Sequence, residues 1–155
     1  MPNYWLLKSE PDAYSIDDLA RDTREPWTGV RNYQARNFMR DTMKVGDIAL
    51  YYHSSTTPPG VVGIANVISN PHADQTAFDP KSEYFDPKSS PDNPTWVCVD
   101  IGFVEKFPRM VTLDEIKQDS TLEGILVAKR GMRLSIQPLS EAHFSHITSL
   151  AHQHI

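Results

Sequence analysis

Residues 29–40, with the sequence GVRNYQARNFMR, concentrate polar side chains that are able to bind a nucleotide. Asn32 and Asn37 carry amide donors and acceptors that suit the Watson–Crick edge of cytosine or adenine. Arg31 and Arg36 can hold adjoining phosphates through charge-assisted hydrogen bonds. A structural alternative uses the same residues differently: Asn32 caps a helix, Asn37 closes a turn, and the arginines pair with carboxylates on neighbouring loops.

Aromatic and hydroxyl side chains near this segment could form a slot for a base. A base taken out of its stack needs apolar or aromatic walls for its faces and fixed hydrogen-bond groups for its edge. Trp27 and Tyr33 flank the basic cluster. Further candidates end a predicted strand: Tyr51, Tyr52, His53 and Ser54. Because neighbours on a strand point to opposite faces, only one of the two tyrosines can enter the same cavity, and we expect it to be Tyr52.

Two more polar groups follow or lie within predicted strands. Lys8, Ser9 and Glu10 come directly after the first one. There Ser9 could bond to a base or sugar, and Glu10 could accept from an exocyclic amine; alternatively both cap the next turn while Lys8 pairs at the surface. Ser135 and Gln137 share one strand face and are either pocket groups or core residues with satisfied hydrogen bonds.

The distribution of charge favours a local contact with anions. The formal net charge is −5. Residues 31–44 hold four basic side chains against one acidic one, for +3, and residues 129–133 add three more, among them Arg130 and Arg133, which leaves −11 for the remainder. An acidic body with two basic segments suits a few phosphates better than a general polyanion surface. The alternative is two solvated surface faces.

Motifs of common enzyme and metal sites are missing. His53 and Ser54 diverge as neighbours on a strand, and no Gly-x-Ser-x-Gly elbow is present. Neither a Walker nor a Rossmann glycine pattern occurs, so no cofactor is expected. A zinc site at His143 and His146 would need another well-placed ligand, and the single Cys98 excludes an internal disulfide. The sequence thus predicts a protein without catalysis or metal.

Length and composition predict one soluble domain over residues 1–155. Hydrophobic residues make up 39% of the chain and charged residues 23%, which is typical of a globular protein. No stretch of about 18 apolar residues occurs, and Lys8 and Glu10 interrupt the start before a signal-peptide core could form. We therefore expect a cytoplasmic protein that does not bind membranes, with a monomer favoured.

The first half of the chain is predicted to supply strands and two helices that position the candidates. A strand over 3–8 precedes a helix over 14–22 that Ser15 caps, and a loop covers 25–30. A helix over 32–43 is indicated by apolar residues at three- and four-residue spacing. Buried strands over 47–53 and 61–69 are expected to pair as a long-looped hairpin.

The second half begins with an irregular segment. Residues 70–95 are rich in proline and polar residues, and a doubled DPKS phrase within them is typical of turns. A strand over 95–107, a helix that starts with a Thr112–Glu115 capping box, a helical turn, a strand over 132–139 and a short helix capped by Ser140 follow. Strands scattered among short helices, without regular alternation, indicate the α+β class.

Six separated motifs then resemble one family. They are YWLLKSEPDAYSIDDL, WTGVRNYQARNFMR, VGDIALYYHSS, GVVGIANV, FDPKSEYFDPKS and RLSIQPL, and they extend from Tyr4 to Ile147. This order resembles the EVE domains, which belong to the PUA-like superfamily and are distantly similar to YTH domains. The resemblance implies a small, mixed, partly open β-barrel with peripheral helices that binds a modified base in DNA or RNA, with methylcytosine or hydroxymethylcytosine favoured. The basic N-terminal tail of nuclear eukaryotic members is absent, so a bacterial type is expected.

With this resemblance, we interpret the protein as a non-catalytic reader of a modified base. The predicted base pocket comprises Ser9, Glu10, Trp27, Asn32, Tyr33, Asn37, Tyr52, His53, Ser54, Ser135 and Gln137. The predicted phosphate contacts are Lys8, Arg31, Arg36, Arg130 and Arg133. A PUA-like module for structured RNA is one alternative. A small nucleotide or base hydrolase, with His53 or Glu10 as general base, is another.

Overall fold

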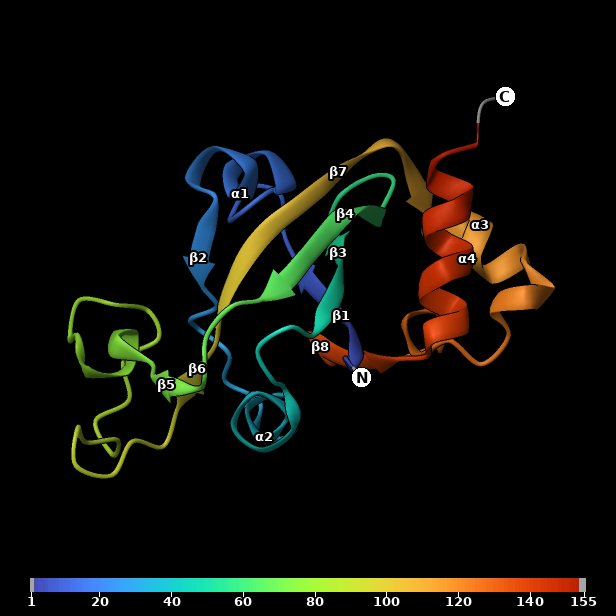
Figure 1. Ribbon diagram of the computed structural model, residues 1–155. Helices are drawn as coiled ribbons and strands as arrows, with labels where there is room; N and C mark the ends of the chain where they lie inside the picture. The colour runs from blue at the N-terminus through green and yellow to red at the C-terminus, as the bar shows by residue number, and fades with distance from the viewer. Residues whose placement is uncertain (1, 154–155) are drawn as a thin grey trace.

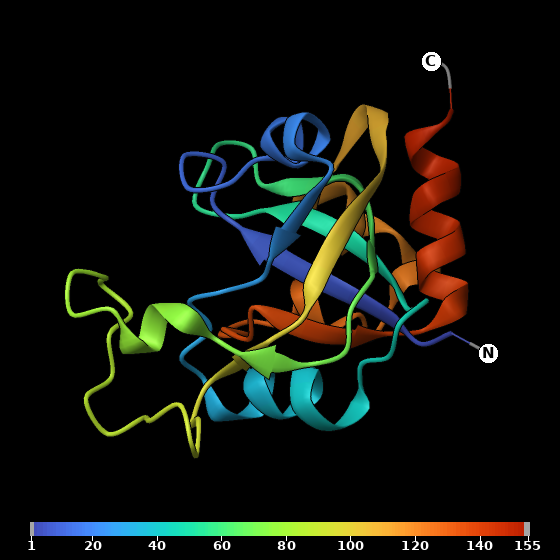
Figure 2. The same cartoon turned by 60° about the vertical axis from the view of Figure 1, so that its left-hand side comes forward.

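The computed structural model describes residues 2–153 and contains one six-stranded sheet that curls into a partly open barrel (Figures 1 and 2). Its strands, in spatial order, are β2 (Arg24–Pro26), β7 (Asp100–Thr112), β4 (Gly60–Val67), β3 (Ile48–His53), β1 (Tyr4–Ser9) and β8 (Ile136–Leu139). The β1–β3 pair is parallel and the other pairs are antiparallel. This mixed sheet with flanking helices confirms the predicted α+β class and barrel architecture.

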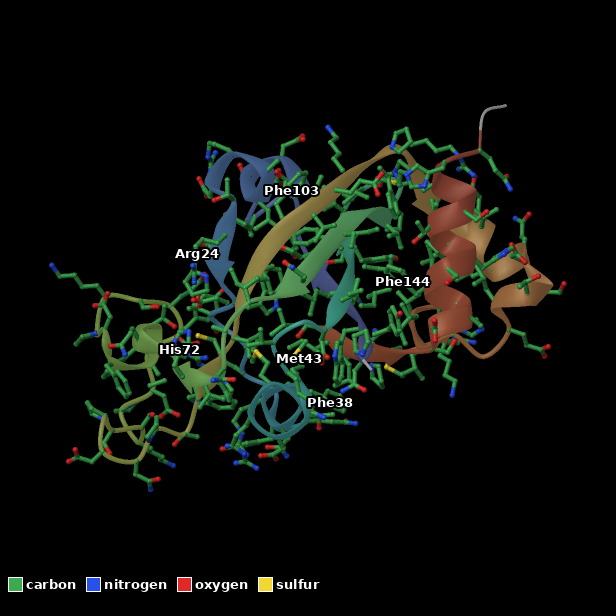
Figure 3. The ribbon with its side chains drawn as sticks, in the orientation of Figure 1. Arg24, Phe38, Met43, His72, Phe103 and Phe144 are labelled. Atoms are coloured by element: carbon green, nitrogen blue, oxygen red, sulfur yellow. The ribbon has the colours of Figure 1, made fainter. Side chains whose placement is uncertain are left out.

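Both faces of the sheet are buried. Trp5 and Leu7 of β1 belong to one hydrophobic cluster, whereas Leu6 between them belongs to a second cluster on the opposite face. Alternate residues of a strand point to opposite sides, so β1 contributes to both clusters. Phe144 of α4 (Glu141–Ala151) packs on Tyr4 at a ring-centroid distance of 4.9 Å, on the side that α3 (Leu113–Gln118) and α4 cover (Figure 3).

The predicted helix starts are confirmed. Ser15 caps α1 (Ile16–Asp22) and forms a reciprocal capping box with Asp18. The same arrangement links Thr112 to Glu115 at the start of α3, and Ser140 accepts a hydrogen bond from the third residue of α4. Each cap satisfies a backbone N–H that has no partner within its own helix, which is why these local signals fix the start of a helix.

Several boundaries differ from the prediction. The helix predicted over 32–43 is α2 (Tyr33–Asn37), which continues as a π-helix over Phe38–Thr42. The loop predicted over 25–30 begins with two residues of β2, and its Pro26 is tolerated because β2 lies at the edge of the sheet. The strand predicted over 95–107 is split into β6 (Val97–Cys98) and β7.

The segment between β4 and β7 extends away from the barrel (Figures 1 and 2). It holds β5 (His72–Ala73), which pairs with β6, and a 3-10 helix over Gln75–Phe78, where no regular element was predicted. Short 3-10 helices over Ser120–Leu122 and Leu126–Ala128 complete the fold. Within residues 2–153, no helix is both long and apolar enough to span a bilayer.

Candidate functional site

A cleft of about 410 Å³ opens where the end of β1, the segment after β2, the segment between β4 and β7 and the residues before β8 meet. We call the segment between β4 and β7, residues 68–99, the excursion. Its lining residues are Lys8, Ser9, Glu10, Ala13, Tyr14, Glu25, Pro26, Trp27, Thr28, Gly29, Val30, Arg31, Tyr84 and Ser135. Ligand sites of small molecules typically have volumes of about 300–1,000 Å³. The cleft is therefore large enough for a single base or a similar planar group.

One wall of the cleft is built on Trp27. Its ring packs edge-on against Tyr51 at 5.7 Å and 78°, and the backbone N–H of Trp27 donates to Val99 of the neighbouring chain segment at 2.8 Å. Among residues 2–153 the indole N–H donates to no protein group, and it is not sealed from solvent. Trp27 thus offers the cleft both an aromatic surface and an unused donor.

The floor beside Trp27 is fixed by two hydroxyl groups that share one acceptor. Tyr51 donates its phenol O–H to the backbone carbonyl of Tyr14 at 2.7 Å, and Ser9 donates its hydroxyl to the same carbonyl at 2.8 Å. Burial raises the pKa of Tyr51, so its phenol stays protonated as this bond requires. The Ser9 oxygen keeps its lone pairs and can still accept from an occupant.

A second part of the cleft lining depends on Gly29 and Tyr84. Gly29 has a φ of +82°, and a Cβ placed there would lie 2.7 Å from Cε2 of the Tyr84 ring. Only glycine combines this left-handed backbone with such a close ring. The contact brings the excursion back over the segment after β2, and it makes Tyr84 a wall of the cleft.

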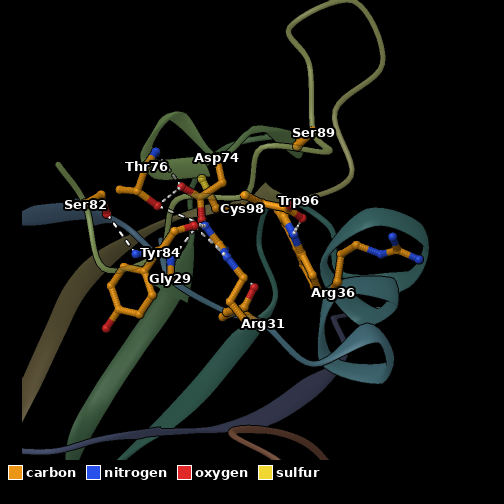
Figure 4. A network of polar contacts seen from close by, with 12 residues as sticks. Gly29, Arg31, Arg36, Asp74, Thr76, Ser82, Tyr84, Ser89, Trp96 and Cys98 are labelled. Carbon is orange, nitrogen blue, oxygen red and sulfur yellow. Dashed lines mark hydrogen bonds and ion pairs between the residues drawn. The ribbon is translucent and has the colours of Figure 1, made fainter. Parts of the chain in front are cut away.

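Arg31 connects the two segments and uses all five of its N–H groups (Figure 4). Nε and Nη2 donate to the Tyr84 carbonyl, Nη1 donates to the Val30 carbonyl and to Asp74, and Nη2 also donates to the Thr76 hydroxyl. A guanidinium has five such donors. Arg31 therefore lines the cleft with its hydrogen-bonding capacity already satisfied by protein groups, as in the structural alternative.

Asp74 is the buried partner of this arginine. One carboxylate oxygen accepts from the Gly29 N–H at 2.8 Å and from Arg31 at 3.1 Å, and the other accepts from the N–H and hydroxyl of Thr76. Burial alone would raise the pKa of Asp74, but the bonds from Thr76, Gly29 and Arg31 outweigh it and hold the pKa below its usual value. We call Arg31, Asp74 and Thr76 the Arg31 latch.

The structure brings six predicted site residues together at the cleft: Lys8, Ser9, Glu10, Trp27, Arg31 and Ser135. The ammonium of Lys8, however, lies 5.9 Å from the centre of the Tyr52 ring, and burial lowers the pKa of Lys8. Burial, together with nearby acidic groups, raises the pKa of Glu25, a second carboxyl of the cleft beside Glu10.

Eight further residues predicted for the site do not line the cleft: Asn32, Tyr33, Arg36, Asn37, Tyr52, His53, Ser54 and Gln137. Asn32 is the N-cap of α2 and accepts from the Ala35 N–H at 3.0 Å. The Asn37 side-chain oxygen accepts from Arg36. Gln137 is buried, and its amide donates to the Leu134 carbonyl at 2.9 Å. The side chains of Asn32, Asn37 and Gln137 are therefore used within the fold.

Of the two neighbouring tyrosines of strand β3, Tyr51 packs behind the cleft, whereas Tyr52 was the one expected to enter it. Tyr52 lies in the second hydrophobic cluster with Leu6, whereas Tyr51 backs Trp27. His53 is buried, and its Nε2 accepts from the backbone N–H of Ile16 at 3.1 Å. Burial lowers the pKa of His53, which agrees with a neutral imidazole that accepts this bond. Nothing at β3 except Tyr51 thus supports the cleft.

The second basic segment is exposed. Arg130 and Arg133 form no hydrogen bond or ion pair with any residue in the described part of the chain, and the chain passes from them directly to Ser135 at the cleft. Guanidinium groups without protein partners are suited to phosphate contacts.

Tyr14 and Tyr84 line the cleft but were not predicted from the sequence. Tyr14 follows the predicted KSEP turn, and Tyr84 lies between the two DPKS phrases. The glycine at position 29 indicates that another segment packs closely against the backbone there, but the sequence does not identify that segment. Within residues 2–153, no cluster of three or more histidine, cysteine or acidic residues could hold a metal ion.

Comparison with known proteins gives consistent matches. The family described as EVE domain matches residues 3–150. The human protein "Thymocyte nuclear protein 1" is 37% identical over 169 residues, which cover 97% of this chain and 74% of that protein. A solved structure of a Pseudomonas syringae protein has 44% identity and a TM-score of 0.91, and covers 96% of this chain and 99% of that one.

A second solved structure includes nucleic acid. It is the crystal structure of human THYN1 protein in complex with 5-methylcytosine-containing DNA, with 36% identity and a TM-score of 0.90. The match covers 99% of each chain. The cleft residues of this chain therefore lie within a backbone that closely follows that of a DNA-bound protein.

Proposed function

This chain belongs to the EVE domain family, and from that membership we propose that it is a non-catalytic reader that holds a modified cytosine base of DNA in the cleft. The observation that carries the proposal is the cleft itself, which is lined by the Trp27 ring with its unused N–H and by the aromatic ring of Tyr84. The similar human protein was solved with 5-methylcytosine-containing DNA. Methylcytosine or hydroxymethylcytosine is the proposed ligand.

The charge of the cleft supports a base as its occupant. Glu10 and Glu25 line it together with Lys8, whose ammonium lies over the Tyr52 ring. Because Arg31 is already saturated, a phosphate placed inside would meet two carboxylates and no free guanidinium. A cytosine is neutral and carries an exocyclic amine, for which a carboxylate is a suitable acceptor. Phosphates would instead remain outside, within reach of Arg130 and Arg133.

The edge of the base finds complementary groups. The Trp27 N–H can donate to the carbonyl oxygen or ring nitrogen of cytosine, and Glu10 can accept from the amine. The hydroxyls of Ser9 and Ser135 add adaptable partners. The two aromatic side chains cover apolar surface, including the added methyl group, whose burial favours the modified base.

The hydrolase alternative named His53 or Glu10 as general base, and the position of His53 does not favour it. The His53 Nε2 accepts from a backbone N–H in a buried site, and His53 does not line the cleft. Glu10 does line the cleft, where the reader proposal uses it as a hydrogen-bond acceptor. A general base must reach the proton that it removes. Cytoplasmic location, a monomeric state and the bacterial type stay predictions.

The first test compares the binding of the purified protein to matched single- and double-stranded DNA and RNA that carry cytosine, methylcytosine, hydroxymethylcytosine, adenine or methyladenine. We expect a preference of about tenfold, or 1.4 kcal/mol, for one modified cytosine. Weak, salt-sensitive binding without such a preference would contradict a base reader and favour the structured-RNA alternative.

Substitutions at Trp27 locate the site. Trp27→Ala should remove the preference, whereas Trp27→Phe keeps a ring but lacks the N–H and should retain only part of it. His146→Gln is the control, because His146 pairs with Asp119 far from the cleft-lining residues. If Trp27→Ala folds and discriminates as well as the control, the cleft is not the site.

A further inference from the structure

A row of aromatic rings and guanidinium groups continues from the edge of the cleft to α2. Figure 4 labels Tyr84, Arg31, Trp96 and Arg36 of this row. Its members, in spatial order, are Tyr84, Arg31, Trp96, Tyr33 and Arg36. The Arg31 carbon Cζ lies 5.5 Å from the Tyr84 ring centre and 5.1 Å from that of Trp96, and Tyr33 stacks on Trp96 at 4.9 Å and 26°. We call these five residues the aromatic–arginine row.

The row ends in an aromatic surface that the protein leaves open. Tyr33 is 60% exposed, although its ring is held in a fixed stack on Trp96, which is 5% exposed. The Arg36 Cζ lies 4.8 Å from the Tyr33 ring centre and only 5.9 Å from that of Trp96. A group centred on the outer face of Tyr33 would be much farther from Trp96, so these two distances place the Arg36 guanidinium on the Trp96 side of the Tyr33 ring. The 60% exposure of Tyr33 therefore leaves its outer face accessible.

Arg36 also keeps unused donors next to this face. Nε and Nη2 donate to the Asn37 side chain, and Nη1 donates to the Thr95 carbonyl. Among residues 2–153, one N–H on each of its two terminal nitrogens has no partner. A guanidinium held by these bonds and placed beside an open ring is arranged to receive a phosphate without further ordering.

The ring of Tyr33 is likewise held in a fixed position before any ligand binds. It is the first residue of α2, whose start is fixed by the Asn32 cap, and its stack on Trp96 is held in turn by the Trp96 N–H bond to Asp86 at 2.8 Å. Little conformational freedom remains to be lost when a second planar group stacks on it. Aromatic side chains that bind unpaired bases in this way accept any base, because every base has a π face.

We propose that the outer face of Tyr33 is a stacking site for an unpaired base that flanks the base in the cleft, with Arg36 on the adjoining phosphate. The inference rests on the proposed function, because the base in the cleft fixes the position of the strand. A base within an intact duplex is covered on both faces by its neighbours, so this site selects a strand that is unpaired beside the modified base. Tyr33 thus contributes affinity for single strands, and the cleft contributes discrimination.

The test measures fluorescence anisotropy of the full chain with short single-stranded DNA that carries one central methylcytosine or cytosine. Tyr33→Ala should weaken binding to both by about 5- to 150-fold, the range expected for one lost base stack. Tyr33→Phe keeps the ring and should bind within about twofold of the original protein. Val104→Ala, which shortens an exposed apolar residue of β7 outside the row, is the matched control.

Removal of single bases from the DNA identifies the partner of Tyr33. An abasic site at one flanking position should reproduce the loss, and Tyr33→Ala should then cause no further loss on that DNA. Arg36→Gln should lower the slope of log affinity against log salt by about one phosphate contact.

The results separate this inference from the proposed function. Loss of affinity in Tyr33→Ala with an unchanged ratio between methylcytosine and cytosine supports a stacking site beside an independent reading cleft. Wild-type binding by Tyr33→Ala on every DNA, or an equal loss at every abasic position, overturns the stacking site even if the cleft discriminates. Absence of single-strand binding by the original protein also overturns it. A wild-type protein that does not distinguish the two bases contradicts the reading cleft alone.

Discussion

Replacement of Asp74 by asparagine tests whether the Arg31 latch holds the excursion against the barrel. Asparagine has nearly the shape of aspartate but has an NH2 group in place of one carboxylate oxygen. Whichever way the amide is turned, this NH2 faces either the Gly29 N–H and Arg31 or the N–H and hydroxyl of Thr76. At least one buried donor then loses its acceptor, and Arg31 loses its counter-charge.

The expected loss follows from these contacts. A hydrogen bond to a charged group contributes about 1.5–3 kcal/mol, and removal of one member of a fully buried ion pair costs about 3–5 kcal/mol. The Arg31 side chain is 23% exposed, so solvent partly compensates for the lost partner. We expect the free energy of unfolding to fall by about 2–4 kcal/mol, which lowers the melting temperature on the order of 10 °C.

Thermal melting by circular dichroism measures this loss, and hydrogen exchange over residues 72–98 locates it. Asp92→Asn is the control, because Asp92 is an exposed carboxylate in the same excursion, and its effect should stay within about 0.5 kcal/mol. The Asp74 pKa is depressed in the folded protein, so its stabilisation is present above the ordinary carboxyl range and is lost as pH falls through the folded pKa. Equal melting temperatures and equal exchange for both variants would refute the reasoning.

Three further predictions concern other contacts. His152 follows α4 and donates from Nε2 to the carboxylate of Glu105 on β7, and this bond raises the pKa of His152. The stabilisation is therefore complete below the ordinary histidine pKa and disappears as pH rises through the folded value, and urea unfolding of His152→Gln should lack this pH dependence. Gly29→Ala should displace Tyr84 and lower the free energy of unfolding by about 1–3 kcal/mol. It should also lower the affinity for the modified base, and an unchanged affinity in a binding titration would show that Tyr84 does not contribute to the site. Ser15→Ala should lower the free energy of unfolding by about 0.5–2 kcal/mol, and no measurable change in equilibrium unfolding would contradict a stabilising role of the cap.

Local sequence signals identified the parts of the fold that depend on near neighbours. The caps at Ser15, Thr112 and Ser140 were predictable, because a side chain and the N–H that it satisfies lie within three residues of each other. The antiparallel pairing of the strands around residues 47–69 was also predicted and is confirmed. By contrast, β2 has three residues and exists only through its pairing with β7, so its own sequence gave no strand pattern.

The candidate site was only partly predictable for the same reason. Trp27, Ser9 and Ser135 could be selected by residue type. The choice between Tyr51 and Tyr52 needed the register of the sheet, since a shift of one residue reverses the face, and the structure places Tyr51, not the expected Tyr52, against Trp27. Whether Arg31 is free for a phosphate depends on residues more than 40 positions away.

The class of the fold, the helix starts and the kinds of groups available for binding follow from interactions between near neighbours in the chain, such as periodicity and capping. Which of these groups face a common cleft depends on long-range packing. It brought Tyr84 onto Gly29, it saturated Arg31, and it left the face of Tyr33 open. Such contacts join segments far apart in the chain, and their geometry follows from the packing of the whole sheet, which no local pattern records.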